Sequence, residues 1–145
     1  MYKPTVVYED NHLLCVSKHP GEIVQGDKTG DEPMSEALKG WLKEKYNKPG
    51  NVYLGVIHRL DRPVGGLVLF AKTSKALSRM NELFRTGDVS KCYWAVVTAR
   101  PPKHSDTLEQ YLVRNESQNK SYVARQGAAT PGAKLARLSY RLLAS

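Results

Sequence analysis

The order of hydrophobic and polar positions predicts a β-hairpin at the start of the chain. Residues 5–8 and 13–17 are short apolar runs, and the turn-forming residues 9–12 join them. Residues 18–21 contain a proline and a glycine, which interrupt the pattern. Residues 26–33 are polar and contain glycine, so we expect a loop there.

Two later segments carry apolar residues at helical spacing. In the first, Pro33 suits an opening helical turn and residues 49–50, proline and glycine, end the unit. We expect the second helix over residues 74–86, capped by Thr73 or Ser74 and closed by Gly87. The apolar stripe of the first is Met34, Ala37, Leu38, Trp41 and Leu42, and that of the second is Leu77, Met80, Leu83 and Phe84.

The remaining patterns predict strands. Residues 52–57 precede a charged loop, residues 66–72 are apolar on both faces as in a central strand, and residues 90–97 form a further strand. Weaker strand patterns cover residues 107–113 and 121–125, and residues 134–142 alternate clearly. Strands outnumber helices and most connections are hairpin-like. The predicted fold class is therefore α+β, a mixed, mainly antiparallel sheet flanked by helices.

Composition narrows the choice of function. The 145 residues suit one domain, and 22 Lys and Arg against 14 Asp and Glu give a net charge of +8. This excess favours a polyanionic partner such as nucleic acid, although many basic proteins have no such function. No apolar run reaches the ~18 residues of a membrane helix, and the N-terminus lacks a signal-peptide pattern. Cys15 and Cys92 show no metal-ligand spacing, and we interpret them as reduced thiols in a cytoplasmic protein.

The candidate site is the segment 58–66. It places one carboxylate, Asp61, between the guanidinium groups of Arg59 and Arg62, among turn-forming residues. The apolar run that follows predicts a buried strand directly behind this loop. A charged loop on a rigid strand is a common way to present a reactive group.

These residues resemble the signature of the RluA-type RNA pseudouridine synthases. The signature is histidine-arginine-leucine-aspartate-arginine, here residues 58–62, then a glycine and an apolar strand that ends in alanine-lysine-threonine, here residues 66–73. Further matches follow in order along nearly the whole chain. They are residues 7–10, 13–16 and 18–21 (a lysine-proline-glycine turn), residues 91–95 (lysine-x-tyrosine-x-alanine) and residues 134–142.

The resemblance implies a chemistry and roles for particular residues. It implies isomerisation of uridine to pseudouridine in structured RNA, either ribosomal or transfer RNA, with no metal, nucleotide or redox cofactor. Asp61 matches the nucleophile, and Tyr93 matches a tyrosine that stacks on the flipped base and assists proton removal at C5. The alternative for Tyr93 is a core tyrosine in a strand.

The resemblance and the basic character also supply candidates for RNA binding. Arg59 would fill the space that the flipped base leaves, and Arg62 would contact phosphate. His58, Lys72 and Lys91 are further candidates. Alternatively, the two arginines are solvated loop residues, and His58 braces the loop by hydrogen bonds.

Two departures from the family pattern keep other functions open. Residues 63–65 are proline, valine and glycine where many members carry small polar residues, and the family's final arginine-rich motif does not occur before Ser145. We therefore expect a single catalytic domain over residues 1–145 that lacks the final motif and strands. An RNA-binding remnant without catalysis and an unrelated protein-interaction domain are the alternatives. We also expect self-association through the open edge of the last strand.

Overall fold

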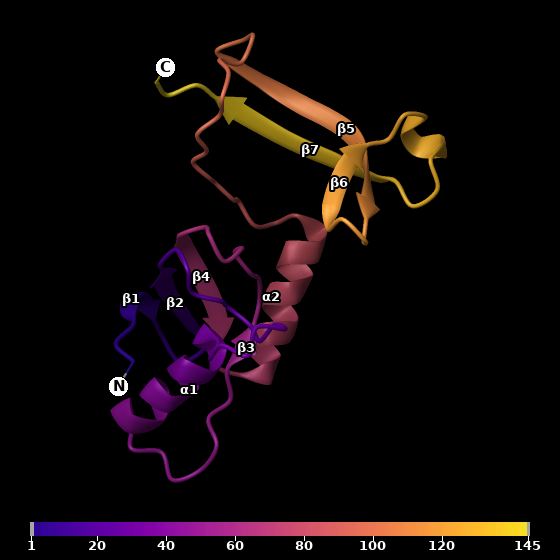
Figure 1. Ribbon diagram of the computed structural model, residues 1–145. Coiled ribbons are helices and arrows are strands. Elements are labelled where there is room, and N and C mark those ends of the chain that lie inside the picture. Colours follow the sequence, from indigo (N-terminus) through magenta and orange to yellow (C-terminus); the bar gives the residue numbers. More distant parts are fainter. Residues whose placement is uncertain (1, 145) are drawn as a thin grey trace. The chain divides into compact units, whose positions relative to one another are not determined.

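The computed structural model describes residues 2–144 and divides into two compact units, Met1–Cys92 and Tyr93–Ser145. Figure 1 shows the elements of each unit. The first unit contains β1 (Thr5–Glu9), β2 (Leu13–Lys18), α1 (Met34–Lys45), β3 (Gly55–Val56), β4 (Gly66–Ala71) and α2 (Ser74–Thr86). The second contains β5 (Ser105–Asn115), β6 (Lys120–Val123), the 3-10 helix η1 (Gly127–Ala129) and β7 (Lys134–Arg141).

The first sheet is antiparallel, with the strand order β1-β2-β4-β3. Its register places Leu14 opposite Phe70 and Val16 opposite Val68, and all four side chains are fully buried. Successive side chains of a strand point to opposite faces, so these residues form one apolar face. This face and the buried stripe of α1 make the core of the unit.

Helix α2 has the bounds that the sequence predicts. The Thr73 hydroxyl accepts a hydrogen bond from the backbone N–H of Ala76 at 3.1 Å, so Thr73 rather than Ser74 is the cap. Gly87 ends the helix in the left-handed conformation, with φ of 81°. The predicted apolar stripe is less buried than expected, because Ala76 is the buried residue of this helix and Leu83 is 40% exposed.

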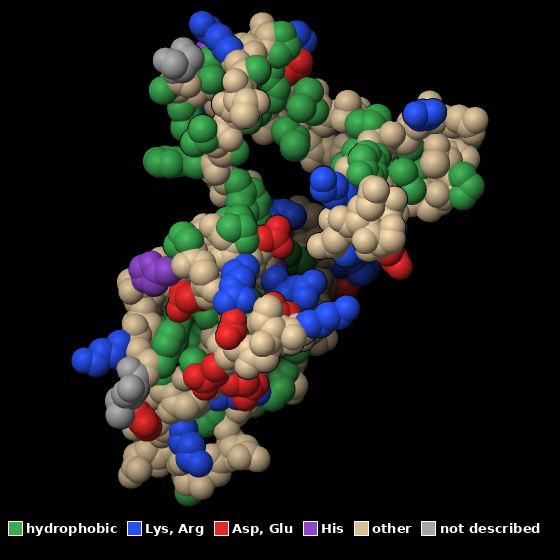
Figure 2. Space-filling view, viewed as in Figure 1, with side chains coloured by type: hydrophobic (Ala, Val, Ile, Leu, Met, Phe, Trp, Pro, Cys, Tyr) green, Lys and Arg blue, Asp and Glu red, His purple; other side chains and the backbone are tan. Residues whose placement is uncertain are grey.

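The second sheet is also antiparallel, with the order β6-β5-β7. Leu108 and Leu138 pair across β5 and β7, yet they are 45% and 55% exposed. Among the described residues of this unit, Ala124 is the one buried hydrophobic side chain. Figure 2 accordingly shows many apolar side chains, in green, on the surface of the second unit.

The α+β class is confirmed, but two details of the prediction are wrong. The strands form two antiparallel sheets instead of one mixed sheet, and residues 90–97 form no strand. Trp94 and Val96 in that segment are 88% and 103% exposed. A strand persists only when a neighbour pairs with its backbone groups, and within residues 2–144 no strand pairs with this segment.

The expectations for residues 52–57, for membrane helices and for the number of domains differ in their outcomes. The strand predicted over residues 52–57 is confined to the two residues of β3. None of the helices described is long and apolar enough to cross a bilayer. The interpretation of residues 1–145 as one catalytic domain stays a prediction.

Candidate active-site loop

A buried lysine organises the loop that carries Asp61. Lys18 is the last residue of β2, and only 1% of it is exposed. Its Nζ donates to the backbone carbonyl oxygens of Asp61, Arg62 and Val64 at 3.1, 3.0 and 2.6 Å. It also donates to the carbonyl of His19 at 3.2 Å. The cation therefore fixes the backbone of Asp61 and of two residues that follow it.

The cost of burying a cation explains why the loop wraps around Lys18. An ammonium group that leaves water must recover its hydrogen bonds, and carbonyl oxygens with partial negative charge supply them here. Burial lowers the pKa of Lys18, while the charges of Glu22 and Asp61 act in the opposite direction. The loop and the buried lysine thus stabilise each other.

Backbone hydrogen bonds and two glycines complete the turn. The N–H of Val64 donates to the carbonyl of Asp61 at 3.0 Å, and the N–H of Gly21 donates to the carbonyl of Arg62 at 2.8 Å. A Cβ on Gly65 would lie 3.3 Å from the carbonyl oxygen of Lys18. Gly66 has a φ of 143°, which favours glycine. A side chain at position 65 would therefore push the carbonyl of Lys18 away by a few tenths of an ångström, so glycine suits this close approach.

His58 holds the loop from the side of β4. Its Nε2 accepts a hydrogen bond from the backbone N–H of Leu69 at 3.0 Å, and its ring stacks on Phe84 with the centroids 5.3 Å apart. Burial, and next the charge of Lys91, lower the pKa of His58, which favours the neutral ring that can accept this bond. This geometry agrees with the bracing interpretation, and a role of His58 in RNA binding stays a prediction.

The charged side chains of the loop face solvent. Asp61, Arg59 and Arg62 are all exposed. Arg62 forms an ion pair with Asp31 from the preceding loop. Within the described residues, the guanidinium of Arg59 forms no hydrogen bond or ion pair with another side chain. The loop therefore combines a fixed backbone with an accessible carboxylate and two accessible guanidinium groups.

The other predicted site residues lie elsewhere. Lys72 follows β4 at the end opposite to Gly66, about 20 Å away by the rise of a strand. Lys91 is exposed and close enough to His58 to affect its pKa. Tyr93 belongs to the second unit and is 63% exposed. Asp61, Arg59, Arg62 and His58 thus share one loop, Lys91 lies near His58, and the proposed roles of these residues stay predictions.

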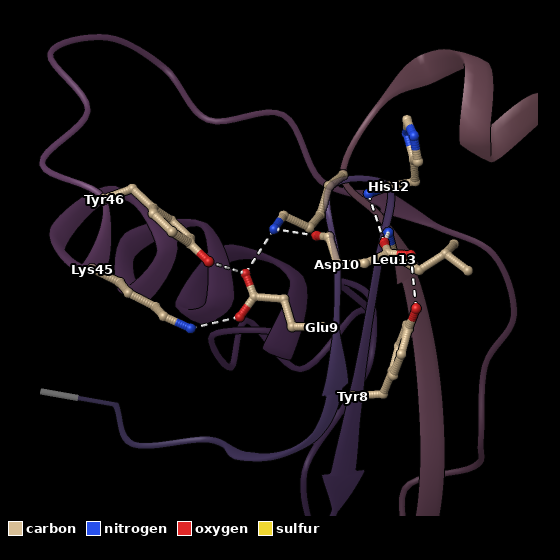
Figure 3. A network of polar contacts seen from close by, with 8 residues as sticks. Tyr8, Glu9, Asp10, His12, Leu13, Lys45 and Tyr46 are labelled. Carbon is tan, nitrogen blue, oxygen red and sulfur yellow. Dashed lines mark hydrogen bonds and ion pairs between the residues drawn. The ribbon is translucent and has the colours of Figure 1, made fainter.

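A second polar network is centred on Glu9 (Figure 3), and Lys72 belongs to it. The Glu9 carboxylate accepts hydrogen bonds from Lys45, Tyr46 and Lys72 at 2.6, 2.6 and 2.7 Å. Burial raises the pKa of Glu9, but these three partners outweigh it and hold the pKa at about 2. Lys72 also donates to the carbonyl of Asp10 at 2.6 Å. This lysine therefore links β1 to the end of β4.

Sequence reasoning did not assign Lys18 or Asp31 to the site. Strand alternation could have identified Lys18, because it shares a face with the buried residues Leu14 and Val16. No comparable signal exists for Asp31, whose partner is 31 residues away. Within residues 2–144, no group of three or more His, Cys, Asp or Glu side chains is arranged to hold a metal ion.

Comparison with known protein families gives a match over nearly the whole chain. The profile of the family described as RNA pseudouridylate synthase matches residues 12–145. Ribosomal large subunit pseudouridine synthase C of Salmonella typhi is 30% identical over 120 residues, which cover 83% of this chain and 36% of that protein. The Vibrio cholerae protein of the same name is 32% identical over 111 residues, 77% of this chain and 33% of that protein. The chain thus spans about a third of these relatives.

A solved structure supports the fold. The structure titled Human RNA Pseudouridylate Synthase Domain Containing 4 superposes with a TM-score of 0.78 at 23% identity. The superposition covers 97% of this chain and 54% of the human one. At this level of identity the likeness concerns the arrangement of the backbone alone.

Proposed function

Because this chain belongs to the RNA pseudouridylate synthase family, we propose that it carries the nucleophile loop of an enzyme that isomerises uridine to pseudouridine in RNA. The observation that carries the proposal is the loop around Asp61. Its backbone is held by Lys18, while the carboxylate stays exposed between two arginines. Such an arrangement gives a nucleophile a defined position without blocking the approach of a substrate.

In the proposed reaction, Asp61 is the nucleophile and the uracil changes its point of attachment. The bond between N1 of the base and C1′ of the ribose breaks, the base turns, and a bond between C5 and C1′ forms. C5 loses a proton and N1 gains one, so the product is an isomer of the substrate and no electrons are exchanged. The carboxylate of Asp61 allows the change to proceed in two steps through a covalent intermediate.

The neighbouring residues fit supporting roles in this proposal. A base within a stem must leave the stack, at a cost of a few kcal/mol, before Asp61 can reach it. The planar guanidinium of Arg59 is free to stack in the space that the base leaves. Arg62 is assigned to a phosphate of the backbone. Tyr93 would stack on the flipped base, and its hydroxyl would assist the loss of the C5 proton.

We propose structured RNA as the partner and ribosomal RNA of the large subunit as the preferred substrate, with transfer RNA as the alternative. The names of the relatives from Salmonella typhi and Vibrio cholerae support the first choice. The net charge of +8 supports a polyanionic partner. A cytoplasmic location follows from this proposal and stays a prediction.

Substitution of the nucleophile tests the proposal. Asp61→Asn should lower the rate of pseudouridine formation by about 10⁴-fold or more, as loss of a nucleophile does in other enzymes. The assay is incubation with unmodified large-subunit ribosomal RNA and transfer RNA, followed by mapping of pseudouridine. Asp106→Asn, which changes a partly exposed carboxyl of β5 in the second unit, is the matched control. Equal activity of the Asp61→Asn protein would show that Asp61 is not the nucleophile.

A second function, RNA binding without catalysis, also has an observation in its favour. Trp94 and Val96 are almost fully exposed, and the apolar side chains of the second sheet are about half exposed. Exposed aromatic and apolar side chains of this kind can serve binding without forming an enclosed catalytic site. Salt-dependent RNA binding without any modified product would favour this function over catalysis.

A further inference from the structure

We propose that Asp31 is an electrostatic latch on Arg62: its carboxylate occupies the guanidinium until a phosphate of the RNA displaces it. The inference rests on the proposed function, since it names RNA phosphate as the group that competes with Asp31. It adds that the loop at residues 26–33 controls one of the two arginines beside Asp61. In the resting protein, Arg59 would be available to RNA and Arg62 would be held.

The backbone of Arg62 is held in place by hydrogen bonds that do not involve Asp31 or its loop. Its carbonyl oxygen accepts hydrogen bonds from Nζ of Lys18 at 3.0 Å and from the N–H of Gly21 at 2.8 Å. Only the side chain is therefore free to change partner. Release from Asp31 would leave the position of Asp61 unchanged and would free a guanidinium directly beside it.

Acidic side chains of the loop at residues 26–33 lie near Arg62, although only Asp31 forms an ion pair with it. The carboxylate of Asp27 accepts hydrogen bonds from the N–H and the hydroxyl of Thr29. The pKa of Asp27 is lowered by these bonds first, and also by the charge of Arg62. A hollow of about 220 Å³ beside Arg62 is lined, among others, by Glu22, Asp31 and Glu32. Arg62 thus lies among several carboxylates, and an RNA phosphate would have to displace that of Asp31.

The Arg62–Asp31 ion pair is exposed, which allows a phosphate to replace Asp31. The side chains of Arg62 and Asp31 are 45% and 53% exposed, so water and salt screen their attraction. By contrast, Lys72 and Glu9 are only 13% and 10% exposed, which suits a permanent structural contact. A guanidinium binds carboxylate and phosphate with the same two-pronged geometry. A phosphate can therefore take the place of Asp31 and accept the same kind of hydrogen bonds from Arg62.

A double-mutant cycle tests the latch. Asp31→Asn removes the carboxylate charge, and Glu32→Gln removes a charge from the neighbouring residue as the matched control. Each is made in the natural chain and in an Arg62→Gln background. Binding to an unmodified large-subunit ribosomal RNA transcript is measured by filter binding from about 0.05 to 0.2 M salt. Thermal melting confirms that each variant is folded, and Asp31→Ala serves as a second variant.

Asp31→Asn should tighten binding by about two- to fivefold, which is the range for one exposed ion pair, and more than Glu32→Gln does. Arg62→Gln should weaken binding and reduce the salt slope by roughly one. In the Arg62→Gln background the gain from Asp31→Asn should vanish. An equal gain in both backgrounds, or no gain, would overturn the latch. If the natural chain shows no salt-dependent RNA binding, it is the proposed function that fails.

Discussion

Two residues that need not touch the substrate set the geometry of the candidate nucleophile. Lys18 draws the carbonyls of residues 61, 62 and 64 toward one buried ammonium. His58 binds the same loop to β4 through the N–H of Leu69. The carboxylate of Asp61 is thus accessible because the backbone beneath it is held from two sides.

The Lys18→Met variant should be destabilised by about 2–4 kcal/mol, since several carbonyl oxygens would lose their partner on burial. Urea unfolding measures this loss. Lys48→Met is the matched control, because Lys48 is exposed and should change stability by less than ~0.5 kcal/mol. An unchanged unfolding midpoint for Lys18→Met would mean that the loop does not depend on this cation.

The contribution of His58 to the free energy of unfolding should depend on pH. Its pKa in the folded protein lies below the ordinary value of 6.5. The His58 ring therefore binds a proton more readily in the unfolded chain than in the folded protein. Its contribution to stability is complete above about pH 6.5 and is lost as the pH falls below that value. The difference in unfolding free energy between the natural protein and His58→Gln should shrink in that range. A difference that stays constant between about pH 8 and pH 5 would contradict this prediction.

At the scale of elements, α1 is fixed to the first sheet at two places. Its buried stripe, with Leu38 and Leu42 at 0% and 1% exposure, packs on the sheet face that Val16 and Val68 form. Its C-terminal end is tied to β1 by the bonds from Lys45 and Tyr46 to Glu9. Apolar packing places the helix, and the Glu9 network fixes its end against the strand.

Removal of the Glu9 charge should weaken this tie in a pH-dependent way. The pKa of Glu9 falls from 4.5 to about 2 in the folded protein. Its contribution to stability is therefore complete above about pH 4.5 and is lost as the pH falls toward 2. Glu9→Gln should lower the urea midpoint at neutral pH, and the gap to the natural protein should close in acid. Glu44→Gln, an exposed residue of α1, is the control, and an equal effect of both would contradict the prediction.

At the scale of the whole molecule, the two units differ in how much apolar surface they bury. The first unit has a continuous core of buried residues from β2, α1 and β4. The described part of the second unit leaves Leu108, Leu135 and Leu138 about half exposed. The two units should therefore differ in stability and in their tendency to associate.

The second sheet should promote self-association of the chain. β7 is an edge strand, paired with β5 on one side, and open strand edges together with exposed apolar faces favour contact between copies. Size-exclusion chromatography over a wide concentration range should show dimers or larger species. Leu138→Lys should reduce them, whereas Leu67→Lys, at similar exposure in the first unit, should not. A monomer at all concentrations would contradict this expectation.

Local patterns in the sequence determined much of the first unit and the place of the candidate loop. The bounds of α2 follow from a threonine cap and a glycine stop, which act within one helical turn of the residues concerned. The strands β2 and β4 follow from apolar runs, and segment 58–66 follows from its charges and turn-forming residues. These features depend on neighbours along the chain, so they could be predicted without coordinates.

Tertiary structure alone decided the features that depend on distant partners. Residues 90–97 have the composition of a strand, but backbone pairing decides whether they become one, and no strand pairs with them here. The contact between Lys18 and the carbonyl of Asp61 joins residues 43 positions apart, and the pair of Arg62 with Asp31 joins residues 31 apart. Which carbonyls a buried cation binds, and which carboxylate an arginine meets, follow from how the whole chain folds.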